Sequence, residues 1–123
     1  MPTAADLIGT WRLSRFSEWS ADGREHHPIG DRPSGYAVFD TTGRVFFQLS
    51  RSPEEGASAQ EVAASFMAYF GRVTVDGETL SVAAESGNNP ADVGTIQTRT
   101  ITLDGNTLTI GIPGRIMATL RRA

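Results

Sequence analysis

The chain has 123 residues and a formal net charge of −3 at pH 7; 39% of its residues are hydrophobic and 20% are charged. This length and balance are typical of one soluble domain, residues 1–123, with enough apolar side chains to fill a core. Because the chain has no cysteine, the composition excludes disulfides, thiolate nucleophiles and cysteine-based zinc or iron–sulfur sites. All eleven basic residues are arginine, which excludes a side-chain Schiff base, and the acidic balance argues against nucleic acid as a partner.

The amino-terminal residues 1–6 have neither the basic nor the apolar segment of a secretory signal. No apolar run approaches the roughly 18 residues that a transmembrane helix needs. We therefore expect a cytoplasmic protein with no membrane partner.

Short stretches of alternating apolar and polar residues dominate the chain, separated by turn dipeptides. Asp22-Gly23, Asp76-Gly77 and Asp104-Gly105 supply the positive φ that tight hairpins need. The pattern predicts eight strands, at residues 9–19, 35–40, 44–51, 71–76, 79–86, 95–103, 107–112 and 115–122.

One segment, residues 59–70, has helical rather than strand spacing. Ser58 and Glu61 form a Ser-x-x-Glu capping box before it, and Gly71 is suited to end it. The sequence therefore predicts one short helix between the third and fourth strands. Its apolar positions are Val62, Phe66 and Tyr69 or Phe70.

Eight antiparallel strands in mostly sequential hairpins favour an up-and-down barrel, whose interior holds side chains or one small ligand. A β-sandwich is the alternative, but it usually needs longer cross-sheet connections. The predicted fold class is mainly β. The long connections, at residues 20–34, 52–70 and 87–94, gather at one end, which we take to be the mouth because binding sites concentrate on loops.

In the strand 95–103, alternation places Gln97 and Arg99 in the same phase as the apolar Ile101 and Leu103. If the apolar pair faces the core, Arg99 faces it too, nearer the mouth. Arg99 is then a structural residue at a wet rim or a cation that meets a ligand, unless a bulge shifts the phase.

Tyr36, also near the mouth, is either a half-buried structural residue or a hydroxyl donor to a ligand. In the strand 9–19 the apolar phase changes near Arg15, which predicts a bulge or bend; Arg15 either points inward or forms the kink itself. The strand 44–51 is apolar on both faces, so its second face either packs in the core or forms a homodimer interface.

Reactive side chains are scarce. The two histidines, His26 and His27, are adjacent and point to opposite sides of an extended chain, so we predict no metal site. No nucleophile elbow, phosphate loop or dinucleotide fingerprint is present, and we predict no cofactor. His27 is either an exposed loop residue or a general acid–base at the mouth. The carboxylates able to pair with Arg99 or act as a base are Asp31, Glu85 and Asp92.

Several motifs are spread over nearly the whole chain. They are Gly9-Thr10-Trp11, Pro28-Ile29-Gly30, Pro33-Ser34-Gly35-Tyr36, Phe39-Asp40, Gly43-Arg44, Ala68-Tyr69-Phe70-Gly71, Val93-Gly94, Gln97-x-Arg99 and Leu103-Asp104-Gly105-Asn106. Together they resemble the small bacterial lipocalin-like domain family. The resemblance implies a barrel that takes a small molecule, with Trp11 closing its floor under Arg121 or Arg122 of the last strand.

The chain departs from the family pattern at two places. Arg15 stands where members often carry serine, and residues 82–84 lack a histidine that members often carry there. The resemblance implies small-molecule binding and transfers no reaction.

Three functions remain open. The first is a cofactor-free enzyme of the cyclase or isomerase type, in secondary metabolism, acting on a largely apolar metabolite in the lumen. Its catalytic candidates are Arg99, Gln97, Tyr36 and His27, which can stabilise charge on a carbonyl oxygen or move a proton. The second is a carrier for a small hydrophobic or amphipathic molecule, and the third is a structural module with a filled lumen. The predicted ligand contacts are Trp11, Leu13, Phe47, Phe66, Val82 and Leu108.

Overall fold

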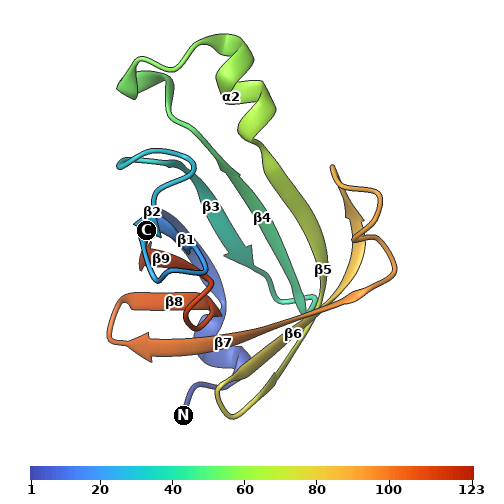
Figure 1. The fold of residues 1–123 in the computed structure, drawn as a ribbon. Coiled ribbons are helices and arrows are strands. Elements are labelled where there is room, and N and C mark those ends of the chain that lie inside the picture. The colour runs from blue at the N-terminus through green and yellow to red at the C-terminus, as the bar shows by residue number, and fades with distance from the viewer.

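The computed structural model describes residues 1–123 and shows one antiparallel sheet that curls into a closed barrel (Figure 1). Each of the eight barrel strands pairs with the next barrel strand along the chain, and pairing between the first and the last closes the barrel. The barrel strands are β1 (Gly9–Trp19), β3 (Ser34–Phe39), β4 (Arg44–Ser50), β5 (Met67–Asp76), β6 (Thr79–Gly87), β7 (Ile96–Asp104), β8 (Thr107–Ile112) and β9 (Ile116–Arg122). The predicted eight-stranded up-and-down barrel is confirmed.

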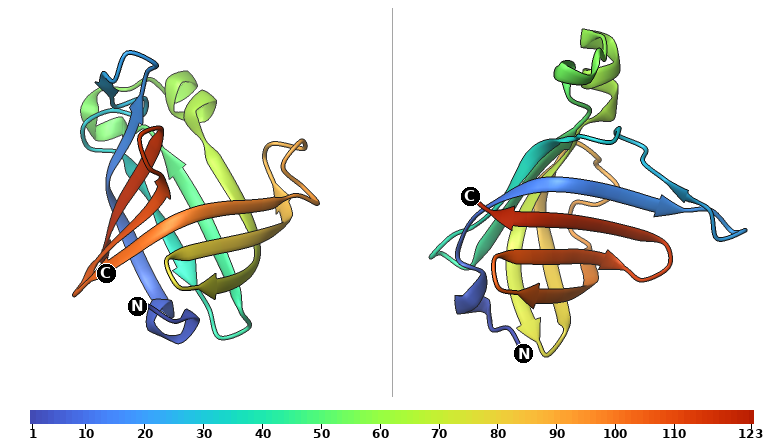
Figure 2. Two further views of the ribbon diagram at one scale, coloured as in Figure 1. Left: turned by 60° about the horizontal axis from the view of Figure 1, so that its bottom comes forward. Right: turned by 90° about the vertical axis from the view of Figure 1, so that its left-hand side faces the viewer.

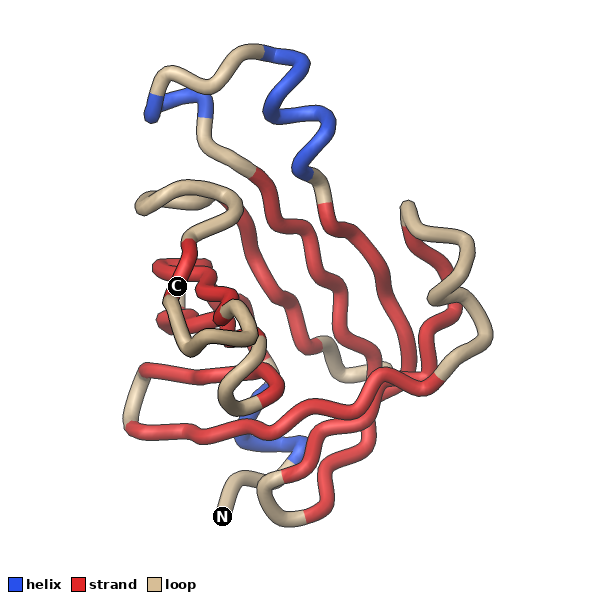
Figure 3. The backbone as a smooth tube through the Cα atoms, in the orientation of Figure 1, coloured by secondary structure: helices blue, strands red, loops and turns tan.

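A two-residue strand, β2 (Glu25–His26), pairs with the end of β1 inside the long first connection. The helices lie at the two ends of the barrel (Figure 3). The helix α1 (Ala4–Leu7) precedes β1, while the 3-10 turn η1 (Pro53–Glu55) and the helix α2 (Ala59–Ser65) lie between β4 and β5. Neither α-helix has the length and hydropathy needed to cross a membrane.

The predicted capping box of α2 is present: Ser58 Oγ accepts from the backbone N–H of Glu61, and the Glu61 carboxylate accepts from that of Ser58. The helix nevertheless ends at Ser65, so the prediction of a helix up to residue 70 was wrong. Residues 67–70 belong to β5 and pair with β4. Gly71 is not a helix cap but an inward strand position, where a Cβ would overlap the Ala83 carbonyl.

The reason for this error is that residues 67–70 are apolar on both faces. Met67 and Tyr69 face the barrel interior while Ala68 and Phe70 face outward. Such a run fits a helix or a strand by spacing alone, and only the pairing with β4 and β6 decides between them.

The bulge predicted near Arg15 is confirmed. The register of β1 against β9 shifts between Leu13 and Arg15, so Ser14 is the extra residue. Trp11 and Leu13 face inward before the bulge and Phe16 does so after it, whereas Arg15 is exposed. Arg15 therefore does not point into the lumen.

The barrel floor is sealed by Trp11, which is fully buried and donates its indole N–H to the Leu7 carbonyl at 2.9 Å. The Arg122 guanidinium lies 4.1 Å from the centre of the Trp11 ring and donates to the carbonyls of Ile8 and Asp6. Arg122, rather than its neighbour, thus covers the tryptophan. Figure 2 shows this closed end, with the N-terminus and α1, opposite the end that carries α2.

Candidate functional site

The barrel is filled by its own side chains near the floor, but a cavity of about 110 Å³ remains in the lumen above them. Its wall is almost entirely apolar and draws on six strands. The wall includes Phe16, Phe47, Met67, Tyr69, Ile110 and Arg99. Arg99 is the one charged side chain in that wall.

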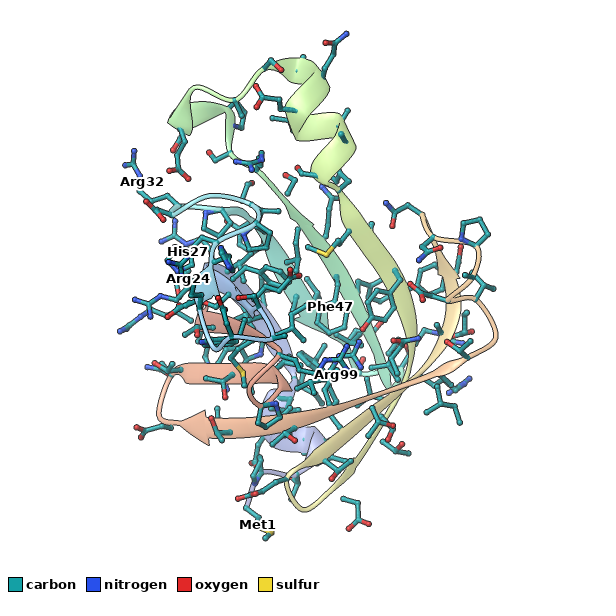
Figure 4. The ribbon with its side chains drawn as sticks, in the orientation of Figure 1. Met1, Arg24, His27, Arg32, Phe47 and Arg99 are labelled. Carbon is teal, nitrogen blue, oxygen red and sulfur yellow. The ribbon has the colours of Figure 1, made fainter.

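Arg99 faces this cavity because β7 keeps a continuous register with both of its neighbours, so no bulge shifts its phase. Figure 4 shows Arg99 and Phe47 in the interior, on opposing walls. Nη2 of Arg99 donates to Oε1 of Gln97 at 3.1 Å, and Nη1 donates to the Thr98 carbonyl at 2.8 Å. The four ion pairs of the structure all lie elsewhere, so no carboxylate neutralises this guanidinium.

Tyr69 is the site residue that the sequence prediction missed. It lies on the inward face of β5, with its ring centre 5.0 Å from that of Phe47. Burial raises the pKa of the Tyr69 phenol above its usual value, and Asp92 adds to that while Arg99 opposes it. The phenol is therefore a protonated hydrogen-bond donor at neutral pH. Continuing the alternation of residues 71–76 backwards would have placed Tyr69 inside.

His27 does not join this group. Its Nδ1 lies 2.7 Å from Oδ1 of Asp31, and its Nε2 lies 3.1 Å from Oε2 of Glu25, which also accepts from the Ser17 hydroxyl. The hydrogen bonds to Asp31 and then Glu25 raise the pKa of His27. Ser17 follows the inward Phe16 on β1 and so lies on the outer side of the wall. His27 thus fastens the β1–β3 connection to the barrel exterior.

Tyr36 also lies outside the lumen, because Ala37 and Phe39 take the inward positions of β3. Its side chain is 47% exposed, and with Phe46 and Phe70 it borders an open groove of about 600 Å³ across the outer face of β3 to β6. The groove is larger than the lumen cavity, but it lacks the enclosure that holds small ligands. Tyr36 and Arg99 therefore lie on opposite sides of the barrel wall and do not form one site.

The six predicted ligand contacts lie in three different parts of the structure. Phe47 lines the cavity. Trp11 forms the floor, and Leu13, Val82 and Leu108 are buried in the filled part of the barrel; all four belong to the core and are absent from the cavity wall. Phe66, the residue that follows α2, is not in the cavity wall and borders a separate hollow between η1 and α2 with Val62. Which of the six contact a ligand stays a prediction. Alternation shows which side chains face inward but not how far up the barrel their packing reaches.

The three carboxylates predicted at the mouth also lie in different surroundings. Glu85 stands at a register shift between β5 and β6 and pairs with Arg44 at 2.8 Å on the outer face. Asp31 pairs with His27. Asp92 is the one of the three whose charge contributes to the raised pKa of Tyr69. No group of His, Asp and Glu side chains is arranged to hold a metal ion.

A closed eight-stranded barrel whose floor is a tryptophan under an arginine of the last strand is what the sequence resemblance implied. The family model of the lipocalin-like domain matches residues 8–120. The chain belongs to the lipocalin-like domain family. As a lipocalin-like barrel, it has a fold suited to small-molecule binding.

Two crystal structures share the fold of this lipocalin-like domain. One is a lipocalin-like protein from Bacteroides uniformis, 18% identical, with a TM-score of 0.58 over 96% of this chain and 99% of that chain. The other is an uncharacterized protein from Bacteroides eggerthii, 14% identical, with a TM-score of 0.58 over 96% of this chain and 100% of that chain. At these identities the likeness concerns the fold alone. No curated protein matches the chain.

Proposed function

We propose that this lipocalin-like domain binds a small, largely apolar molecule in its lumen and holds an oxygen atom of that molecule with Arg99 and Tyr69. The observation that carries the proposal is a pair of donors in an otherwise apolar cavity, one of them a guanidinium without a carboxylate partner. Donors that converge in an apolar pocket fix the orientation of a ligand, while the apolar wall contributes affinity.

The size of the cavity limits the ligand. A cavity of roughly 150 Å³ holds one benzene molecule, and the lumen offers about 110 Å³. The lumen is therefore somewhat too small to enclose a whole ring, and suits a short branched group or one part of a ring. A larger molecule would place that part inside and extend its remainder through the mouth.

A cofactor-free cyclase or isomerase of secondary metabolism is the second candidate function. Arg99 and the protonated Tyr69 can stabilise negative charge that develops on a carbonyl oxygen. Asp92, whose charge contributes to the raised pKa of Tyr69, is the mouth carboxylate that we propose as the base of this candidate. Binding without catalysis ranks first because neither Tyr36 nor His27, the other proton-moving candidates, reaches the lumen.

Native mass spectrometry after exposure to a metabolite extract of the producing cells tests the proposal. Wild type and Arg99→Gln are compared with Arg115→Gln, which alters an exposed arginine in the β8–β9 turn. We expect a bound mass on wild type and on Arg115→Gln that is lost or reduced on Arg99→Gln. A bound compound that is replaced with time by an isomer or a dehydrated product would favour the enzyme. No bound mass on any form would contradict the proposal and favour a structural barrel.

A homodimer and a cytoplasmic location stay predictions from the sequence. Phe46, on the outer face of β4, is 39% exposed and lies against Phe70 with ring centres 5.2 Å apart. If a second copy covers this face, light scattering will give twice the chain mass for wild type and a monomer mass for Phe46→Ser. A monomeric wild type would contradict the dimer.

A further inference from the structure

A chain of hydrogen bonds runs from the β6–β7 connection into the lumen and ends on Arg99. The Thr95 hydroxyl donates to the Asp92 carbonyl at 2.6 Å. Nε2 of Gln97 donates to Oγ1 of Thr95 at 2.7 Å. Nη2 of Arg99 donates to Oε1 of Gln97 at 3.1 Å. In each of the three bonds the donor is on the side of the Arg99 guanidinium and the acceptor is on the side of the Asp92 carbonyl.

This direction follows from the chemistry of the end groups. A carbonyl only accepts, and a threonine hydroxyl has a single proton. Once Thr95 donates that proton to Asp92, its oxygen can only accept from the next group. Gln97 must therefore turn its NH2 group toward Thr95 and its oxygen toward Arg99. The opposite amide orientation would set two donors against each other at both of its ends.

These hydrogen bonds hold the Arg99 guanidinium in one orientation. Nη2 of Arg99 is held by Gln97 and Nη1 by the carbonyl of Thr98. The remaining N–H groups of Arg99 make no bond to the protein and belong to a cavity wall in which Tyr69 is the other donor. A cation in such a place is stabilised by an anionic partner, and none of the four ion pairs of the protein includes Arg99.

We infer that the lumen takes a carboxylate, and that Thr95 is a positioning residue which, through Gln97, directs the Arg99 guanidinium toward it. This rests on the proposed function, since it names the charged group of the ligand in the same cavity. The planar fork of a guanidinium matches the two oxygens of a carboxylate, and the Tyr69 hydroxyl adds a further donor. A neutral carbonyl has one oxygen and no charge, and so uses this arrangement only in part.

Benzoate and benzamide are suitable probes because they share one ring, part of which can extend from the lumen through the mouth, and differ in charge at pH 7. Binding is followed by two-dimensional amide NMR of the full chain. We expect benzoate to bind about tenfold tighter than benzamide, because hydrogen bonds to a charged group are the stronger kind. Arg99→Gln is expected to abolish the preference.

The role of Thr95 is tested by the ratio of the benzoate affinity to the benzamide affinity, rather than by either affinity alone. Thr95→Val keeps the shape and removes the hydroxyl, so the benzoate preference should fall several-fold, whereas Thr95→Ser should retain it. Thr98→Val is the matched control, because this β7 threonine is exposed and its hydroxyl holds no partner. If Thr95→Val loses its folded NMR spectrum, Gln97→Leu breaks the same chain one residue later.

The outcomes separate the two proposals. Absence of binding by both probes on a folded wild type overturns the proposed lumen site for ring-sized ligands and the inference with it. Equal binding of benzoate and benzamide, unchanged in Arg99→Gln, overturns the carboxylate while leaving lumen binding intact. A benzoate preference that persists in Thr95→Val and in Gln97→Leu overturns the positioning role of Thr95 alone.

Discussion

Truncation of Arg122 should open the floor of the barrel. In the folded chain its guanidinium lies 4.1 Å from the centre of the Trp11 ring and donates to two carbonyls, those of Ile8 at 3.2 Å and Asp6 at 3.1 Å. These three contacts join the last strand to the first strand and to the segment around α1. In Arg122→Ala all of them are lost together, and the ring of Trp11 loses its cover.

The magnitude follows from the exposure of Arg122. A cation–π contact at a partly exposed site contributes about 1 kcal/mol. The hydrogen bonds of this exposed guanidinium compete with water, so each contributes about 0.5 kcal/mol. The free energy of unfolding should therefore fall by about 2 kcal/mol. For a chain of this length, the melting temperature should fall by about 8 °C.

Urea unfolding followed by far-ultraviolet circular dichroism measures this loss, with Arg121→Ala as the matched control. Arg121 is adjacent on β9 and exposed, and its side chain makes no hydrogen bond or ion pair. Its truncation should change the free energy of unfolding by less than about 0.5 kcal/mol. Equal losses in Arg121→Ala and Arg122→Ala would refute the argument that the Trp11 contact stabilises the floor.

Two further predictions concern the barrel wall and its outer loop. Gly71→Ala should lower the free energy of unfolding by about 3 kcal/mol, because the new Cβ would overlap the backbone carbonyl of Ala83; an unchanged urea midpoint would contradict this. The pKa of His27 is raised by its bonds to Asp31 and Glu25, so the stability they add is full below about pH 6.5 and is lost as the pH rises through the folded-state pKa. His27→Gln should flatten the fall in urea midpoint between pH 6 and pH 8, whereas an equal fall in wild type and variant would rule this out.

The fold was predictable to a large extent because its determinants are local. Alternating side chains mark the strands, glycine-containing turns such as Asp76-Gly77 and Asp104-Gly105 mark the hairpins, and the change of phase near Arg15 marks the bulge in β1. Four-residue α1 escaped prediction because so short a helix leaves no periodic pattern. The candidate site was predictable only in part. Gln97 and Arg99 follow from the phase of one strand, whereas Tyr69 was hidden in a run that also fits a helix.

The alternation of the strands and the inward phase of Arg99 follow from the sequence, because each depends on the two-residue period of a strand. The arginine that covers Trp11 was implied by the family resemblance. The length of α2, the height to which the core fills the barrel and the side of the wall on which Tyr36 and His27 lie depend on the folded structure. These features arise between segments far apart in the chain. Pairing with β4 ends the helix, facing side chains from several strands close the lower lumen, and the bonds to Asp31 and Glu25 hold His27 outside it.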